Sequence, residues 1–582
     1  MKPARRSIKL SLLIYSAALA LATAGCHTRS KEAAQTPPPH PVQNGKIEPI
    51  PQSVPSTPAT VSSAFGDKVR EIIASRSLAS MERPAFADYR AHLQGIYQNS
   101  SYAPLWLRSD GVSPQATGII QALEASSLKG LSPEDYDADQ WLARLEALKT
   151  ASDAEKAEFD VTLTVTAMRY VSDLHIGRVN PQHFKFGIDA AAKKYDLPQF
   201  FAQQLLNATD IKSALEQIEP PYDGYHQTEA ALVAYLKLAA EGDSAPIPQV
   251  TKGIAVGDAY PGVAPLVVRL RLLGDLSAGG ELTEYDAAVS EGVKHFQLRH
   301  GLEPDGKLDS KTVTEINTPL STRVHQLQDA LERWRWMPPE FPQPPVVVNI
   351  PEFRLRAFEA GQKVGLAMNV VVGKAAPTQT PVFIDSIKYI VLRPYWYVPY
   401  SIIRNSVIPG LNRSGRGYLA KEDMEITGAP AGASVADLVA GLRAGKFGAR
   451  QRPGPKNSLG LIKFIFPNSN NVYLHSTPAQ QLFSQARRDF SHGCIRLERP
   501  AELASFLLRN QDAGKWTTEA VQKAMDSGAD NRQLNLATPI PVLLIYVTAV
   551  PAEDGTVHFF DDIYGHDRKL EAVLAKGPPY PW

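Results

Sequence analysis

The chain has 582 residues, of which 44% are hydrophobic and 21% charged, and its 61 basic residues against 60 acidic ones leave a formal net charge of +1. One hydrophobic core cannot serve so long a chain, so the sequence predicts several domains. A net charge near zero gives no support for binding to nucleic acid or to an anionic membrane surface, and neither is an expected partner.

Residues 1–25 have the pattern of an export signal. The basic stretch MKPARRSIK precedes a mainly apolar run of sixteen residues, LSLLIYSAALALATAG, and small residues lead to Cys26. The apolar run is shorter than the about 20 residues that a permanent membrane-spanning helix needs. The paired arginines also resemble a twin-arginine signal, although the ordinary secretory route is the preferred interpretation.

The four residues that end at Cys26 resemble a bacterial lipobox, with Thr23 where that pattern usually has leucine. The resemblance implies that a diacylglycerol group is attached to Cys26 after cleavage. His27 follows instead of aspartate, as in lipoproteins that are sorted to the outer membrane. The expected location is the periplasm of a Gram-negative bacterium, with membrane contact only through the lipid on Cys26.

Residues 26–63 are predicted to be a disordered tether, because they are rich in proline and small polar residues and contain almost no large apolar ones. In an extended polyproline conformation such a segment reaches up to about 100 Å. From 64 to 250 the chain instead places apolar residues at spacings of three and four, as in DKVREIIASRSLAS and GIIQALEASSLKG. This pattern predicts a helical scaffold domain, in which the sequence shows no cluster of acids, bases or metal ligands.

Residues 255–320 are predicted to form a separate small domain. They contain two amphipathic stretches, PLVVRLRLLGDL and AAVSEGVKHFQLRHGLEPDGKLDSKTVTEIN, in which Gly301 and the PDG sequence at 304–306 supply turns. The second stretch resembles the peptidoglycan-binding domain of cell-wall enzymes, which implies a three-helix fold. The sequence leaves open whether this domain binds a ligand or is only structural.

After a predicted connecting helix at 321–343, the pattern changes to β-strands over 344–550. Apolar and polar residues alternate in PPVVVNIPEFRLRAF, and PVFIDSIKYIVLRPYWYVP continues the strand pattern. Residues 400–456 are a glycine-rich, irregular insertion with a short helix, which we interpret either as a lid or as a plain surface insertion. Residues 551–582 are predicted to be a C-terminal hairpin and tail. The expected fold class is multidomain α+β, with a mainly β domain that carries the insertion.

Cys494 is the second of the chain's two cysteines. With Cys26 acylated, Cys494 has no partner within the chain, and a free thiol in an oxidising compartment is a liability unless it is buried or used. A nearby imidazole, such as that of His475, or the N-terminus of the helix predicted from Ala501 is expected to lower the thiol pKa and make Cys494 a nucleophile. The backbone N–H groups of 492–494 are then expected to face an oxyanion.

The spacing of His475 and the SHGCIR sequence at 491–496 is similar to that of L,D-transpeptidases with a YkuD-type catalytic domain. The stretches IYQNSSYAPLWL and YVSDLHIGRVNPQ resemble the helical scaffold of the large, YcbB-like members of that family. The resemblance implies that Cys494 is the nucleophile and His475 the general base, whose tautomer is held by the main-chain carbonyl of Ser476. Further residues implied to shape the site are Ser491, His492 and Gly493, and those implied to contact substrate are Arg496, Ser491, Tyr473, Trp396 and Asn457.

The family reaction is acyl transfer on peptidoglycan. The resemblance therefore implies a cysteine thioester with the diaminopimelate of a tetrapeptide stem, release of D-alanine and a 3→3 cross-link to a second stem. No metal or cofactor is expected, because a cysteine nucleophile carries this chemistry by itself. Donor and acceptor stems are the expected partners, with peptidoglycan synthases as possible further ones, and acylation of Cys494 by carbapenems is a further implied property.

Three other interpretations fit the sequence less well. A metal site of His475, His492 and Cys494 has poor ligand spacing, and in cell-wall endopeptidases with a Cys–His pair the cysteine usually precedes the histidine. A non-catalytic lipoprotein that anchors the outer membrane to the wall fits the tether and the small domain, but it leaves the Cys494–His475 pair without a purpose. Within the transpeptidase interpretation, a lipoprotein lysine or a free D-amino acid remains an alternative acceptor.

Overall fold

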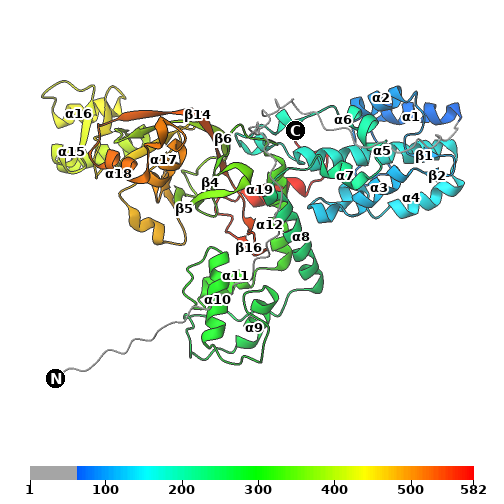
Figure 1. Ribbon diagram of the computed structural model, residues 1–582, viewed down its shortest axis with the longest axis horizontal. Helices are drawn as coiled ribbons and strands as arrows, with labels where there is room; N and C mark the ends of the chain where they lie inside the picture. The colour runs from blue at the N-terminus through cyan, green and yellow to red at the C-terminus, as the bar shows by residue number, and fades with distance from the viewer. Residues whose placement is uncertain (1–61) are drawn as a thin grey trace, which may run out of the picture. The chain divides into compact units, whose positions relative to one another are not determined.

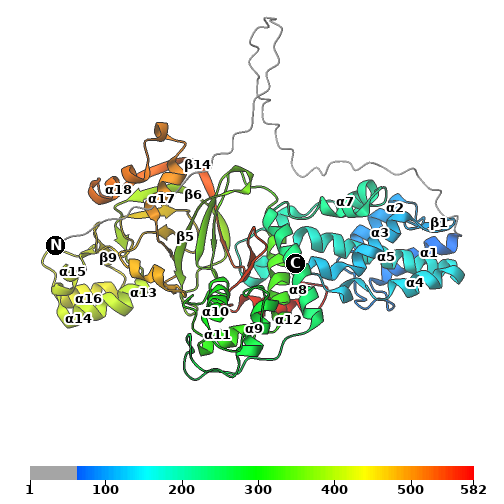
Figure 2. The same ribbon diagram turned by 60° about the horizontal axis from the view of Figure 1, so that its bottom comes forward.

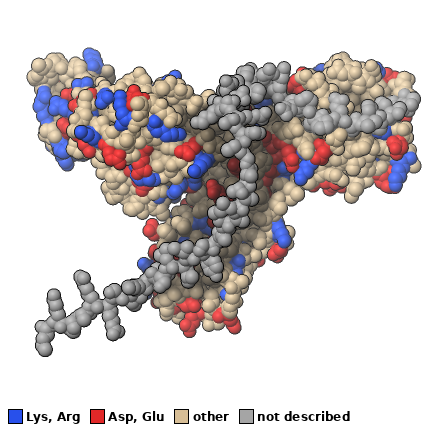
Figure 3. Space-filling model, in the orientation of Figure 1, with Lys and Arg blue, Asp and Glu red and all other residues tan. Residues whose placement is uncertain are grey.

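The computed structural model describes residues 62–582, so the predicted export signal, Cys26 and nearly all of the predicted tether lie outside the described residues. Among the helices of residues 62–582, none is both long and apolar enough to cross a membrane. Figure 3 shows Lys and Arg side chains interspersed with Asp and Glu side chains over the visible face, in keeping with the balanced net charge.

The N-terminal helices pack around α5 (Asp153–Ile176), most of whose residues are buried. A capping box starts this helix, since the Ser152 hydroxyl accepts from Glu155 N–H and the Glu155 carboxylate accepts from Ser152 N–H. A helix that is buried on all sides is the centre of its domain, and this confirms the helical scaffold. The other elements here are α1 (Ser63–Ser75), α2 (Arg90–Asn99), β1 (Leu107–Arg108), β2 (Gly111–Val112), α3 (Pro114–Glu124), α4 (Trp141–Ala147), α6 (Leu197–Phe200), α7 (Ile211–Glu216) and α8 (Asp223–Glu241).

The predicted connecting helix is α12 (Leu320–Arg335), which packs along α8. Glu332 on α12 is fully buried and accepts hydrogen bonds from the main-chain N–H groups of Arg178 (2.6 Å) and Val179 (3.1 Å). Its carboxylate also lies 3.3 Å from the Arg178 guanidinium. This buried acid therefore joins α12 to the turn that follows α5.

The small domain contains three helices, α9 (Val263–Leu272), α10 (Ala287–Arg299) and α11 (Ser310–Ile316), which lie together in Figure 1. The side chains of Asp286 and Asp309 cap α10 and α11 by accepting main-chain N–H groups. A separate hydrophobic core that includes Leu266, Val293 and Phe296 holds the three helices. The expected three-helix fold is confirmed.

The β-rich part of the chain forms a nine-stranded sheet in the order β12-β5-β13-β11-β10-β6-β14-β3-β4. Because β4 also pairs with β5, all strands except β12 close into a ring around the largest hydrophobic core, which α17 (Pro500–Leu508) and α18 (Thr518–Ser527) extend. The strands are β3 (Val346–Asn349), β4 (Arg354–Phe358), β5 (Val364–Gly373), β6 (Phe383–Leu392), β10 (Ile462–Ile465), β11 (Leu474–His475), β12 (Asp489–Ser491), β13 (Ile495–Leu497) and β14 (Arg532–Ile545).

The insertion after β6 is more ordered than its sequence predicts. A three-stranded sheet in the order β7-β9-β8 and several short helices share a hydrophobic core that includes Val407, Leu411 and Leu442. The prediction of an irregular stretch with one short helix was wrong, because helices this short show no clear apolar period in sequence. The elements, several of which are labelled in Figure 2, are β7 (Trp396–Tyr397), α13 (Tyr400–Ile402), α14 (Ile408–Ser414), α15 (Arg416–Lys421), β8 (Met424–Thr427), α16 (Val435–Arg443) and β9 (Gly448–Gln451).

The C-terminal hairpin is formed by β15 (Ala549–Pro551) and β16 (Val557–Phe559), so it begins two residues before the predicted boundary. It is followed by a helix, α19 (His566–Leu574), where the sequence predicted only a tail. The last residues are bound to the scaffold, since Trp582 Nε1 donates to the Arg178 carbonyl (2.7 Å) and Asn180 N–H donates to the Pro581 carbonyl (3.0 Å).

Candidate active site

Cys494 lies in the short turn between β12 and β13. Gly493 has a φ of +114°, a backbone conformation that residues with a side chain rarely adopt, so glycine permits the sharp turn before the thiol. The Ser491 hydroxyl accepts from Gly493 N–H (3.0 Å) and donates to the Cys494 carbonyl (2.6 Å). Ser491 is buried and shapes the turn instead of facing a substrate.

A second loop, after β5, braces the same turn. Thr380 donates its hydroxyl to the Gly493 carbonyl (2.8 Å), and Thr378 donates to the Ser491 carbonyl (3.1 Å). The Tyr564 hydroxyl accepts from Thr380 N–H (3.2 Å). Sequence reasoning missed these three side chains, because nothing in a single sequence shows that residues 378 and 380 contact the turn at 491–494, or that residue 564 contacts residue 380.

His475 is the last residue of β11 and is 4% exposed. Its Nδ1 lies 2.5 Å from the main-chain carbonyl of Ser476, the partner that the resemblance implied. A carbonyl can only accept, so Nδ1 carries the proton and Nε2 is left as the basic atom. Burial, and next the positive charge of Arg496, lower the pKa of His475 to about 4.

The register of the sheet sets the relation between Cys494 and His475. β11 and β13 are parallel, with His475 opposite Arg496 and Leu474 opposite Ile495. One position further, Ile495 N–H donates to the Tyr473 carbonyl (3.1 Å), so Tyr473 lies beside Cys494. Cys494, immediately before β13, and His475 on β11 are thus diagonal neighbours, a spacing that rotation of the side chains can bridge.

Within residues 62–582, no hydrogen bond joins the Cys494 thiol to the His475 ring. The Cys494 Sγ lies 3.8 Å from the Asn471 carbonyl oxygen. Burial raises the pKa of the Cys494 thiol, while hydrogen bonds from Tyr473 and the charge of Arg496 act in the opposite direction. Together with the low pKa of His475, this makes a neutral thiol and a neutral imidazole the resting pair at pH 7.

The sequence-based expectation of a lowered thiol pKa was therefore wrong. The helix expected to start near the cysteine, α17, begins at Pro500, and β13 separates it from Cys494. Its N-terminal N–H groups are consequently not beside the thiol, and the effect of a helix dipole falls off within the first turn.

The expected oxyanion donors are also reduced in number, because Gly493 N–H is already bonded to Ser491. Within residues 62–582, the N–H groups of His492 and Cys494 have no acceptor and remain available. The His492 side chain is exposed and makes no hydrogen bond in the described part of the chain. His492 therefore borders the site through its main chain.

The predicted substrate contacts fall into two groups. Tyr473 and Arg496 are half-buried on the face that carries His475, and the Tyr473 ring lies 5.8 Å from the His475 ring.

The second group belongs to the insertion. Trp396 packs against the hydrophobic core of the insertion. Asn457 is fully buried, and its amide donates to the carbonyls of Pro394 and Arg452, both at 2.9 Å. The burial of Asn457 contradicts the predicted contact with substrate and makes it a support for the end of the insertion.

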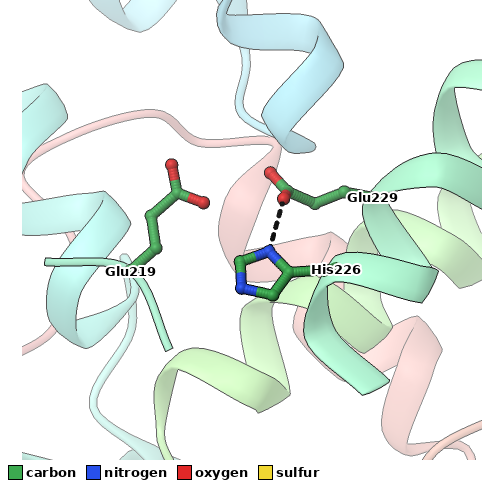
Figure 4. Close-up of side chains that lie close together, drawn as sticks. All are labelled: Glu219, His226 and Glu229. Carbon is green, nitrogen blue, oxygen red and sulfur yellow. Dashed lines mark hydrogen bonds and ion pairs between the residues drawn. The ribbon is translucent and has the colours of Figure 1, made fainter. Parts of the chain in front are cut away.

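A separate cluster of ligand-type side chains lies in the scaffold (Figure 4). In the described part of the chain, Glu219, His226 and Glu229 place ligand atoms within 4.8 Å of one another. Lys129 Nζ lies 2.7 Å from a carboxylate oxygen of both glutamates, so a lysine already offsets part of their negative charge. The expectation that the scaffold holds no cluster of acids, bases or metal ligands was therefore wrong. His226 and Glu229 are three residues apart on α8, and Glu219 lies just before that helix. No such group in residues 62–582 is formed by the alternative ligand set, His475, His492 and Cys494.

Three protein-family profiles match the chain. Residues 91–232 match a scaffold domain, residues 260–316 a "Putative peptidoglycan binding domain", and residues 344–532 the YkuD family, described as the L,D-transpeptidase catalytic domain. The third match contains both His475 and Cys494. The predicted fold class, with a helical scaffold, a small helical domain and a mainly β catalytic domain, is confirmed.

A protein from Haemophilus influenzae named "Putative L,D-transpeptidase" is 31% identical over 228 residues, which is 39% of this chain and 45% of that protein. The match thus spans less than half of that relative's length. The crystal structure of a "Fused Zn-dependent amidase/peptidase/peptodoglycan-binding domain-containing protein" from Clostridium acetobutylicum aligns with 50% of this chain and 99% of its own, at 11% identity and a TM-score of 0.15. A TM-score this low supports no conclusion about the fold.

Proposed function

Since residues 344–532 are a YkuD-type L,D-transpeptidase catalytic domain, we propose that the whole protein is a peptidoglycan L,D-transpeptidase that forms 3→3 cross-links. The observation that carries the proposal is the placement of Cys494, in the turn before β13, diagonally from His475 on β11, with the proton of the His475 ring held on Nδ1 and Nε2 left as the basic atom. The peptidoglycan-binding domain supports peptidoglycan as the substrate.

The first half-reaction forms a thioester. His475 Nε2 takes the thiol proton as Cys494 Sγ attacks the carbonyl carbon of diaminopimelate, at the third position of a tetrapeptide stem. The N–H groups of Cys494 and His492 are the available donors to the oxyanion. His475 then gives its proton to the nitrogen of the leaving D-alanine as the carbon–nitrogen bond breaks.

The second half-reaction reverses these roles. An amine of a second stem attacks the thioester carbonyl and loses a proton to His475, and the carbon–sulfur bond breaks to restore the Cys494 thiol. The neutral resting pair suits both steps, because a neutral imidazole is ready to accept a proton each time.

The test uses the full chain with Cys26→Ser, so that Cys494 is the remaining cysteine. The protein is incubated with a disaccharide tetrapeptide, or with a carbapenem, and analysed by intact-mass spectrometry and by separation of the peptide products. We expect a carbapenem adduct on Cys494 and tetrapeptide dimers, with neither from Cys494→Ala. A folded protein that gives no adduct and no dimer would overturn the proposal and favour the non-catalytic anchoring lipoprotein.

We further propose that the protein is an outer-membrane lipoprotein in the periplasm, tethered through Cys26, and that it works beside peptidoglycan synthases. The lipobox-like sequence at 23–26 supports this location. Labelling of cells with a radioactive fatty acid, followed by membrane fractionation, tests it. Label in the outer-membrane fraction that disappears with Cys26→Ala is expected, and an unlabelled protein in the soluble periplasmic fraction would overturn it.

A further inference from the structure

Five residues form one row across neighbouring strands of the catalytic sheet. Val391 on β6 lies opposite Lys463 on β10, Lys463 opposite His475, His475 opposite Arg496, and Arg496 opposite Val371 on β5. Directly opposed residues share a face of a sheet. His475 therefore lies between two cations, and each cation has a valine on its other side.

This row faces away from the core of the sheet. The residues next to it along the strands are all in the core, and since side chains alternate between faces the row points to the other side. Lys463 leans toward the site, since its Nζ lies 5.9 Å from the centre of the Tyr473 ring. The core-facing neighbours are Ile390, Leu392, Ile462, Phe464, Leu474, Ile495, Leu497, Val370 and Val372.

Neither cation of the row has an ion-pair or hydrogen-bond partner in the part of the chain that the structure describes. Within residues 62–582, the side chains of Lys463 and Arg496 make no ion pair and no hydrogen bond, and Arg496 Nε is buried and unpartnered. Burial lowers the pKa of both groups, as expected for cations without a nearby carboxylate.

Three other buried or half-buried cations of this protein have ion-pair or hydrogen-bond partners. Arg299 pairs with Asp275, Lys193 donates to the carbonyls of His175 and Arg335, and Arg488 donates to four main-chain carbonyls. Half-burying a charge without a partner is unfavourable, so the two free cations are placed for a ligand that supplies negative charge.

The order of residues along the row gives the acyl side and the leaving-amine side of the scissile bond different neighbours. The residue that becomes the acyl group stays with Cys494, which shares β13 and its preceding turn with Arg496. The leaving amine takes its proton from His475, and beyond His475 lies Lys463. The leaving D-alanine is therefore on the side of Lys463, and the acceptor amine later occupies the same place.

Building on the proposed function, we propose that Lys463 binds the carboxylate of the leaving D-amino acid and then that of the acceptor, so that the protein selects acceptor amines with a carboxylate on the same carbon. The terminal amine centre of diaminopimelate and free D-amino acids have this arrangement. The side-chain amine of a lysine does not, because its carboxylate is several bonds away. The inference favours a stem or a free D-amino acid over a lipoprotein lysine as the acceptor.

The test measures acceptor preference in the Cys26→Ser background. Disaccharide tetrapeptide is the donor, and D-methionine, D-methionine amide or Nα-acetyl-lysine is the acceptor, with kcat/KM obtained from the masses of the products. The amide retains the amine and lacks the carboxylate. The amines of D-methionine and D-methionine amide differ in intrinsic pKa. The informative quantity is therefore the ratio of kcat/KM for D-methionine to kcat/KM for its amide, and how this acid-to-amide ratio changes between variants.

We expect Lys463→Gln to lower the acid-to-amide ratio about tenfold or more, as loss of a charge-assisted hydrogen bond predicts, and Lys463→Arg to retain it. Lys388→Gln is the matched control, since Lys388 is an exposed lysine on the same strand as Val391, β6, and does not belong to the row. Each ratio is measured within one variant, so a smaller folded fraction does not affect it.

An unchanged ratio in Lys463→Gln, or equal use of Nα-acetyl-lysine by the unmodified site, would overturn this inference while leaving the proposed function intact. Failure of the proposed function is a different result, because Cys494 would then form no thioester with any acceptor present.

Discussion

The protonation states of Cys494 and His475 determine how fast a small alkylating reagent reacts with the thiol at each pH. Iodoacetamide reacts with the thiolate and not with the thiol. Burial raises the thiol pKa above its ordinary value, so we expect alkylation of Cys494 to be slow at pH 7 and to increase about tenfold per pH unit up to at least pH 8.5.

The structure gives the size of the effect. With a His475 pKa of about 4, about one molecule in a thousand carries an imidazolium at pH 7. An ordinary thiol with a pKa of about 8.5 is about 3% ionised at that pH, and the buried Cys494 thiol is less so. A pre-formed thiolate–imidazolium pair would instead react at nearly the same rate from pH 6 to pH 9.

The assay follows the mass of the Cys26→Ser protein after timed exposure to iodoacetamide between pH 5.5 and 9. Arg496→Gln should slow alkylation at pH 8, because the charge of Arg496 lowers the thiol pKa. Arg499→Gln is the control, since Arg499 is exposed and pairs with Glu502. A rate that is already at its plateau at pH 6 would refute the neutral resting pair.

Three further changes test other parts of the structure. Ser491→Ala removes both hydrogen bonds that shape the turn at Cys494, so we expect carbapenem acylation to slow about tenfold with little change in the thermal midpoint. Ser484→Ala, at an exposed position, is the control. An unchanged acylation rate in Ser491→Ala would contradict the role of Ser491. Replacing residues 400–450 by a short Gly–Ser linker keeps the loop that Asn457 supports. If the insertion is a lid that keeps water from the thioester, this deletion should raise the hydrolysed fraction of product. A hydrolysed fraction equal to that of the full chain would show that the insertion is not a lid. Glu332→Gln leaves the buried Arg178 without its paired carboxylate, so it should lower the free energy of unfolding, measured in urea, by about 3–5 kcal/mol. A loss under about 1 kcal/mol would mean that the buried pair is not needed for stability.

Local sequence determined the features that depend on residues close together in the chain. The apolar spacing from residue 64 onward and the turn at Gly301 were enough for the helical domains, and His475 with the SHGCIR sequence marked the catalytic residues. Gly493 is the clearest case, since a positive φ immediately before the thiol is a backbone requirement that one residue type satisfies.

Tertiary structure decided what depends on strand register and burial. Lys463 is an unremarkable lysine in the sequence, and only the pairing of β10, β11 and β13 places it in one row with His475 and Arg496. The thiol pKa followed burial and not the predicted helix, and the short helices of the insertion are stabilised by a shared core. Charge effects and packing act through space, so residues far apart in the chain set them, and a single sequence does not show which residues meet.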